Sequence, residues 1–481
     1  MDLVTLMRRW SCLDHFLALV GNPESRVTIS TVDLRRCSGT LPRRSLVQLG
    51  LSGLGSLALP DLLRLESQAA SRTGQSLGGK SIIVLWLWGG ASHMETFDLK
   101  PEGPLGFRGE FRPIPTSAPG LDISEHLPKL ATHGDKLAII RSLHHNSPGH
   151  VDSTHTVMTG YPGKDAPPPY RPDYPDFWAV ASKVCGERVS GVPAHMALPR
   201  VRFNGSAYLG AGLEPFRIRS DPNAKNFEVP NLQLNSQMIG RLSERRNLLA
   251  RFDGLRSDID QSGVMDSLDT YNRKAAELLT NGSVRKAFDL SQEKPEVRNR
   301  FGRHAVGQRC LLARRLVEAG VRLVTIDFPC VPGQKAFSWD DHASVWNIFE
   351  QMKIRLPVLD QVSSALIEDL HERGMQDDVL FVIMGEMSHT PRVHYVKGNP
   401  GREHWARAMS VVLSGGGMTM GQPVGATNAR GSLPLHRPLV PGDLLATLYR
   451  YLGVPLDTQF NNHAGRPTPI LPEGGPIDEL I

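Results

Sequence analysis

Histidines gather at a few places in this chain, each beside a carboxylate or a hydroxyl side chain. The 481 residues contain 17 histidines. Imidazole nitrogen together with carboxylate oxygen suits zinc, manganese or iron better than calcium, which prefers oxygen ligands alone. A single histidine of this kind is more often structural than catalytic, but the joint pattern predicts a divalent metal site. The eight histidines that form the pattern are His93, His144, His145, His150, His155, His342, His389 and His404.

These histidines lie next to continuous apolar runs, which predict strands buried on both faces, as in parallel sheets. The runs cover 81–88, 137–141, 321–328, 379–384 and 409–413. Helical patterns lie between them, clearest over 302–319, 344–372 and 441–452, and Pro357 either starts a new helix or kinks the second one. Strands that alternate with helices predict one doubly wound α/β domain, which binds ligands beyond the carboxyl ends of its strands.

The segment 161–290 departs from this alternation. A Pro-rich stretch at 167–175 is followed by a mostly polar helical pattern over 236–290. We expect this segment to be an insertion or cap over one edge of the sheet, within a single α/β domain that spans 70–481.

Residues 1–69 have the features of an export signal and leader. Arg43-Arg44 precedes a small, uncharged apolar stretch at 49–59, and Ser67-Gln68-Ala69 offers a small-x-small cleavage site. This pattern predicts Tat-type export to the periplasm or the extracellular space of a bacterium; a buried helix beginning at Ser45 is the alternative. The apolar stretch is far shorter than the ~20 residues of a transmembrane helix, so we expect no membrane-spanning segment after signal removal.

The composition describes an ordinary globular protein and excludes several partner classes. Hydrophobic residues make up 40% of the chain and charged residues 21%, with a formal net charge of +5. So small a charge on a chain of this size argues against a nucleic-acid partner. The five cysteines lack paired short spacings, which excludes a zinc ribbon and a disulfide-stapled scaffold.

Six short motifs occur in order along the chain: PRR at 42–44, WLWGGASH at 86–93, IRSLHH at 140–145, WDDH at 339–342, MGE at 384–386 and GREHW at 401–405. From about Cys37 to the C-terminus the chain resembles a large bacterial family of Tat-exported proteins of unknown function. That family is regarded as sulfatase-like and is related to the alkaline phosphatase superfamily. The resemblance implies a mixed, mainly parallel sheet sandwiched between helices, with metal ions at the carboxyl ends of the strands.

The resemblance also implies roles for particular residues. Asp340 and His342 resemble the Asp…His pair that holds one metal, Glu386 stands where the superfamily has an Asp-His pair, and His404 matches its late histidine ligand. His93 or Glu95 replaces an early aspartate ligand. His150 lies nearest the position of the nucleophile, with Ser92 and Ser147 as candidate hydroxyl groups. His144, His145 or His150 would transfer protons, and Arg141 and Arg402 would bind the substrate anion.

These expectations lead to two functional hypotheses. The first is an exported metal-dependent hydrolase that acts on anionic substrates, either small-molecule or glycan esters of sulfate or phosphate. The second is a catalytically inert relative that keeps a structural metal and binds an envelope partner or glycan.

Overall fold

The computed structural model describes residues 79–164, 170–229, 282–331 and 334–481. The expected signal and leader at 1–69 lies outside these residues, as does 230–281 of the expected insertion. Within the described part, no helix has the length and apolar character that a bilayer crossing requires.

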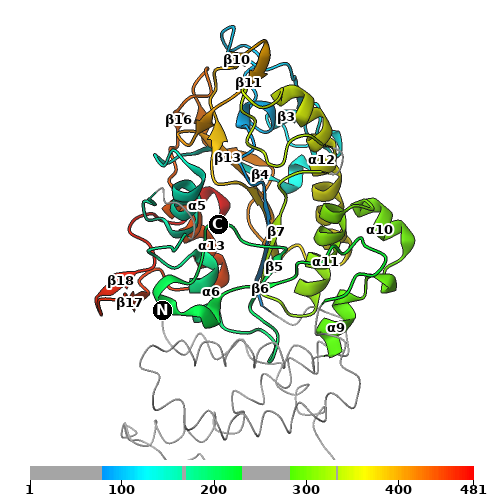
Figure 1. Cartoon of the computed structure of the whole chain (residues 1–481), viewed down its shortest axis with the longest axis vertical. Helices are drawn as coiled ribbons and strands as arrows, with labels where there is room; N and C mark the ends of the chain where they lie inside the picture. Colours follow the sequence, from blue (N-terminus) through cyan, green and yellow to red (C-terminus); the bar gives the residue numbers. More distant parts are fainter. Residues whose placement is uncertain (1–78, 165–169, 230–281, 332–333) are drawn as a thin grey trace, which may run out of the picture. The chain divides into compact units, whose positions relative to one another are not determined.

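An eight-stranded sheet forms the centre of the fold, in the order β14-β4-β13-β8-β1-β7-β5-β6 (Figure 1). All neighbouring strands pair in parallel except β13, which runs antiparallel to both β4 and β8. The architecture is therefore mixed and mainly parallel, as expected. The strands are β1 (Ser81–Trp86), β4 (Ala138–Leu143), β5 (His195–Leu198), β6 (Phe216–Arg217), β7 (Leu323–Asp327), β8 (Val379–Met384), β13 (Met409–Gly415) and β14 (Gln422–Val424).

Helices cover both faces of this sheet (Figure 1). Ile83 and Leu85 of β1 pack into one hydrophobic core with α11 (Ala305–Glu318) and α12 (Ile348–Glu372). Ile82 and Val84 point the other way, into a second core with α5 (His150–Thr159), α6 (Phe177–Cys185) and α13 (Pro441–Leu452). Alternate side chains of a strand point to opposite faces, so a continuous apolar run is buried on both sides, at about 1.5–3 kcal/mol for each large side chain.

Pro357 does not start a new helix, because α12 is continuous over its 25 residues. The helix begins later than expected, where the Asn347 Oδ1 atom accepts hydrogen bonds from the Phe349 and Glu350 amides at 2.9 and 3.2 Å. The proline removes one helical hydrogen bond, and the long buried face of α12 compensates for that loss.

The segment 161–290 is part of the sheet domain as well as an addition to it. Its β5 pairs with β7, and β6 forms the edge beyond β5. Neither strand was expected from the sequence, because runs of four and two residues are too short to show a period.

Short elements complete the described structure. The remaining helices are α4 (Pro128–Ala131), α9 (Gly282–Phe288) and α10 (Pro295–Phe301). The remaining strands form two-stranded sheets: β2 (Pro113–Pro115) with β3 (Asp122–Ser124), β9 (Ser388–His389) with β12 (His404–Trp405), β10 (His394–Val396) with β11 (Asn399–Gly401), β15 (Ala426–Thr427) with β16 (Pro434–His436), and β17 (Gln459–Asn461) with β18 (Pro467–Pro469).

Candidate metal centre

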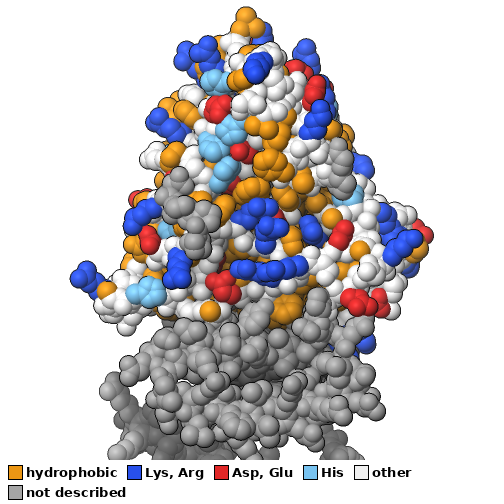
Figure 2. Space-filling model, in the orientation of Figure 1, with side chains coloured by type: hydrophobic (Ala, Val, Ile, Leu, Met, Phe, Trp, Pro, Cys, Tyr) orange, Lys and Arg blue, Asp and Glu red, His pale blue; other side chains and the backbone are white. Residues whose placement is uncertain are grey.

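Four histidines surround the carboxylate of Asp340. The Nε2 atoms of His342, His404 and His389 lie 2.7, 3.1 and 3.2 Å from Asp340 Oδ1. His150 Nε2 lies 3.2 Å from Asp340 Oδ2. We call these five residues and Glu386 the histidine cluster; histidine side chains gather on the face shown in Figure 2.

The carboxyl ends of the parallel strands bring these residues together. In the register of the sheet, Trp86 at the end of β1 stands beside Asp327 of β7 and Met384 of β8. The loop after β7 carries Asp340 and His342, the turn after β8 carries Glu386, and α5 begins at His150 after β4. The β9–β12 pair places His389 directly opposite His404.

Glu386 is fully buried and joins the cluster through His150. Its Oε1 atom accepts hydrogen bonds from the Gly89 amide and from His150 Nδ1, both at 2.9 Å. Its Oε2 atom has no hydrogen-bond partner among the described residues. Gly89 has φ +104°, and a Cβ atom there would lie 2.6 Å from the Asp340 amide nitrogen, so only glycine fits this close approach.

A buried ion pair fixes the loop that carries Asp340 and His342. Asp341 and Arg355 of α12 are both fully buried and paired, and the Trp346 indole donates to Asp341 Oδ1 at 2.7 Å. The Trp339 indole donates to the Phe328 carbonyl at 2.7 Å. The loop is therefore held from both sides by side chains that do not belong to the cluster.

Outer partners set the tautomers of two cluster histidines. His404 Nδ1 donates to the Pro148 carbonyl at 3.0 Å, and His342 Nδ1 donates to the Glu403 carboxylate. With Nδ1 as the donor to these partners, Nε2 of each ring is directed at Asp340, where it donates a proton in the absence of a metal and can offer its lone pair to a bound ion. Metal-binding histidines are oriented in this way by carbonyl and carboxylate partners.

The cluster shifts the pKa values of its members strongly. Burial alone would raise the pKa of Asp340, but hydrogen bonds to four histidines hold that pKa well below its usual range. Burial would lower the pKa of His150, but hydrogen bonds to Asp340 and Glu386 raise it to about 10. Without a metal, the carboxylates are therefore balanced by protons on imidazole rings.

The geometry allows the cluster to hold a metal ion. Ligand atoms of His150, Asp340 and His404 all lie within 4.8 Å of one another. The buried Glu386 Oε2 atom lacks a partner among the described residues, so a further oxygen atom is available beside His150. The structure brings the expected metal residues Asp340, His342, Glu386 and His404 together, with His150 beside them.

The expected ligand His93 does not lie in the cluster. His93 is buried, with Nδ1 2.6 Å from Ser388 Oγ and Nε2 2.7 Å from the Gly431 carbonyl. Ser92, one of the expected hydroxyl groups, is also buried and donates to Glu95 Oε2 at 2.5 Å. Both side chains are held by neighbours from the loops that surround the site.

The two expected anion-binding arginines are held by the protein itself. Arg402 is fully buried and donates to Glu95 Oε1 at 2.7 Å and to the Phe107 carbonyl at 3.0 Å. Arg141 donates to the carbonyls of Phe97 and Asp122 at 2.7 and 2.6 Å. Neither guanidinium group is brought to the histidine cluster.

His145, an expected proton carrier, supports the centre from behind. Its Nε2 atom donates to the Glu386 carbonyl at 2.9 Å, and its Nδ1 atom accepts from the Ser147 amide at 3.2 Å. Burial lowers the pKa of His145 to about 4, so the ring is neutral. Ser147 Oγ is bonded to Thr156 Oγ1 at 2.7 Å.

Three residues near the site had no expected role, and His389 was expected in the metal pattern but not as a named ligand. The three are Glu403, Trp88, whose ring centre lies 5.8 Å from that of His150, and Arg202, which lies over Trp88. His389 was one of the histidines near strand ends, and its spacing from Glu386 was the available signal. Glu403 lies inside the GREHW motif but acts through His342, which spacing alone does not reveal. Arg202 lies far from every motif and reaches the site only through the packing of its loop.

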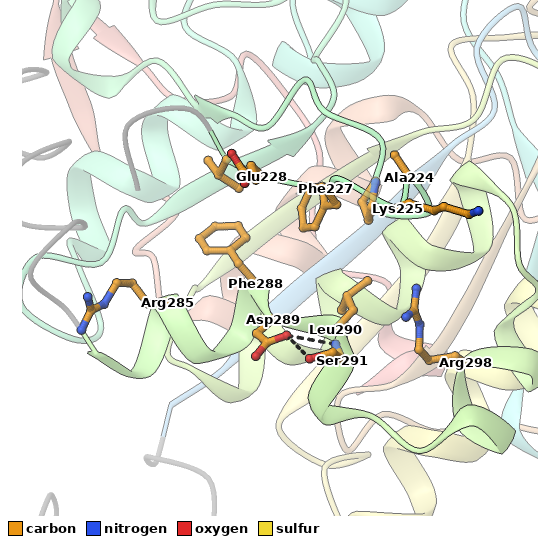
Figure 3. Close-up of a pocket in the computed structure, with 12 residues that line it drawn as sticks. Ala224, Lys225, Phe227, Glu228, Arg285, Phe288, Asp289, Leu290, Ser291 and Arg298 are labelled. Atoms are coloured by element: carbon orange, nitrogen blue, oxygen red, sulfur yellow. Dashed lines mark hydrogen bonds between the residues drawn. The ribbon is translucent and has the colours of Figure 1, made fainter. Parts of the chain in front are cut away.

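A surface pocket of about 340 Å³ lies elsewhere in the molecule, and none of its lining residues belongs to the histidine cluster. Figure 3 shows Phe227, Phe288 and Leu290 lining it, with the Asp289 carboxylate bonded to Ser291. The pocket lacks histidine and cysteine, so the candidate site is the cluster.

Residues 79–481 match the family described as "Protein of unknown function (DUF1501)". No protein with a curated description matches the sequence.

The fold is similar to the PsFucS1 sulfatase from Pseudoalteromonas sp. (11% identity, 86% of this chain and 72% of that one, TM-score 0.35). It is similar to the phosphonate monoester hydrolase SpPMH from Silicibacter pomeroyi (10% identity, 80% of this chain and 74% of that one, TM-score 0.34). It is also similar to the lipoteichoic acid synthase LtaP from Listeria monocytogenes (11% identity, 78% of this chain and 72% of that one, TM-score 0.31). Overlaps this loose assign no chemistry to the chain.

Proposed function

The chain belongs to the DUF1501 family, whose description assigns no activity, and we propose that it is an exported, metal-dependent hydrolase of sulfate or phosphate esters. The observation that carries this proposal is the convergence of four imidazole rings on one carboxylate at the carboxyl edge of the sheet. Such a set suits zinc, manganese or iron.

His150, Asp340 and His404 would hold the ion, with His342, His389 and Glu386 around them. A bound divalent ion stabilises the negative charge that develops on a phosphoryl or sulfuryl oxygen. Glu403 and the Pro148 carbonyl keep the protons of His342 and His404 on Nδ1, so both rings present Nε2 to the centre.

The substrate oxygens would lie at the start of α5. His150 is the first residue of this ten-residue helix, and a helix N-terminus favours anionic groups. The Ser92 and Ser147 hydroxyl groups are bonded to Glu95 and Thr156. We therefore propose a single displacement by water, without a covalent intermediate.

An ester panel with chelator and metal controls tests this function. Purified protein is assayed on aryl sulfates and aryl phosphates with zinc, manganese or iron(II) added. We expect turnover that a chelator abolishes. In Asp340→Asn, which removes charge stabilisation from the centre, the rate should fall by a factor of about 10² or more. The matched control His394→Ala removes an exposed histidine outside the cluster and should keep wild-type turnover.

The second hypothesis, an inert protein with a structural metal, makes the opposite prediction. It is favoured by the engagement of both candidate hydroxyl groups away from the cluster. Stoichiometric metal with no turnover on any ester would support it and exclude the hydrolase.

We also propose export, from the twin arginine, the apolar stretch at 49–59 and the small-x-small site at 67–69. Replacing Arg43 and Arg44 by lysine should keep the full-length chain in the cytoplasm of a bacterial host, because the Tat route reads this pair. Fractionation with an antibody checks the outcome; unchanged export in the lysine variant would contradict a Tat signal.

A further inference from the structure

An arginine cluster lies beside the histidine cluster, at the carboxyl end of β7. Asp327, the last residue of β7, is almost fully buried, and Arg202 Nη2 lies 3.0 Å from its Oδ2 atom. Arg200 Nε lies 3.7 Å from the same oxygen. Arg309 also acts electrostatically on Asp327. Two guanidinium groups thus contact this one carboxylate.

One indole ring connects this group to the histidine cluster. The guanidinium carbon of Arg202 lies 3.7 Å from the centre of the Trp88 ring, and the Trp88 and His150 ring centres are 5.8 Å apart. Figure 2 shows Lys and Arg side chains on the same face as the histidines.

The arginine cluster has positive charge and hydrogen-bond donors in excess. Asp327 carries a single negative charge against the two guanidinium groups that contact it, and the charge of Arg309 is offset by Asp221 as well as by Asp327. Among the described residues, the buried Arg309 Nε and Trp88 Nε1 atoms have no acceptor. Arg202 directs Nε and Nη2 at Asp327 and is still 16% exposed at its side chain. Such a site favours an anion, since charge-assisted hydrogen bonds are strong in a partly buried position.

We propose that Arg202, which lies over the Trp88 ring, binds a second anionic group of the substrate together with Arg200. This proposal rests on the proposed function and names its substrate class: a sulfate or phosphate ester whose leaving group carries a further carboxylate, sulfate or phosphate. Arg202 then selects for a negative charge on the leaving group, a role different from the binding of the ester anion that was expected of Arg141 and Arg402.

Binding of two non-hydrolysable anions tests this subsite without turnover. Calorimetry compares 1,3-benzenedisulfonate with benzenesulfonate on the metal-loaded protein. We expect the disulfonate to bind about tenfold or more tightly, as one charge-assisted hydrogen-bond pair implies. Arg202→Gln should reduce the preference to about twofold or less. Arg466→Gln, which removes an exposed arginine elsewhere, should keep it.

A second variant guards against misfolding, because Arg202→Gln leaves the buried Asp327 with fewer partners. Arg200 is 58% exposed at its side chain, so Arg200→Gln should fold and weaken disulfonate binding alone. Equal binding of both anions by the wild type, or an unchanged preference in both variants, overturns the subsite. If the wild type prefers the disulfonate but hydrolyses no ester, the proposed hydrolase activity is wrong and the proposed anion subsite is supported.

Discussion

Asp340 is the residue on which the account of the site depends. It is the common partner of four histidines, and its low pKa keeps it ionised at any physiological pH. A partly buried carboxylate surrounded by imidazole rings is balanced by either protons or a metal ion. The same donor set thus explains both the pKa shifts and the metal affinity that we propose.

Glu403 should tune metal affinity without contacting the centre directly. Glu403→Gln keeps the shape of the side chain but removes the charge that holds the proton on His342 Nδ1. We expect metal affinity to fall about 10–100-fold, the usual effect of removing an outer partner. Competition with a metal-binding dye measures the metal affinity of the variant and of the wild type.

The matched control for that measurement is Glu473→Gln, which changes an exposed glutamate elsewhere. Equal affinities in both variants would show that Glu403 has no part in the metal centre.

At the scale of elements, the site depends on how α12 holds the loop after β7. Arg355 and Asp341 are fully buried partners, and burial raises the pKa of Asp341 despite the nearby arginine. Breaking such a pair leaves a buried charge without compensation, which costs about 3–5 kcal/mol.

Arg355→Met should therefore destabilise the fold by about that amount. The double variant Arg355→Met/Asp341→Asn should recover part of the loss, because no charge remains buried. Urea unfolding of the wild type, both single variants and the double variant measures the coupling. Additive effects would mean that the pair does not anchor the loop.

Most of the sheet could be predicted from the sequence, because apolar runs such as 379–384 are specific to strands buried on both faces. The edge strands β5 and β6 could not, since their length gives no period. Histidines beside strand ends predicted most members of the histidine cluster. His93 lies outside the cluster because its loop turns the ring towards Ser388, and Arg402, expected to bind the substrate anion, is turned towards Glu95.

At the scale of the whole molecule, buried neutral histidines couple stability to pH. His195 on β5 is bonded to Thr325 Oγ1 at 2.9 Å and stacks on Trp178. Burial, with a contribution from Arg217, lowers the pKa of His195 to about 3. The folded pKa is below the unfolded value of about 6.5. The stabilisation is therefore complete above pH 6.5 and is lost as the pH falls towards 3.

His195→Gln should remove this part of the pH dependence. Between pH 7 and pH 5 the wild type should lose about 2 kcal/mol more unfolding free energy than the variant. Urea titrations at the two pH values measure the difference. His145 adds the same pH dependence to the unfolding free energy of both proteins, so its contribution cancels. Equal losses would show that His195 is not held neutral by the fold.

The most direct measurement of the central claim is the metal content of the purified chain and its cluster variants. Elemental analysis should find roughly one or two equivalents of zinc, manganese or iron in the wild type and in His394→Ala. It should find almost none in Asp340→Asn or His404→Ala, whose circular dichroism should match the wild type. An equal metal content in folded Asp340→Asn and wild-type protein would contradict the account.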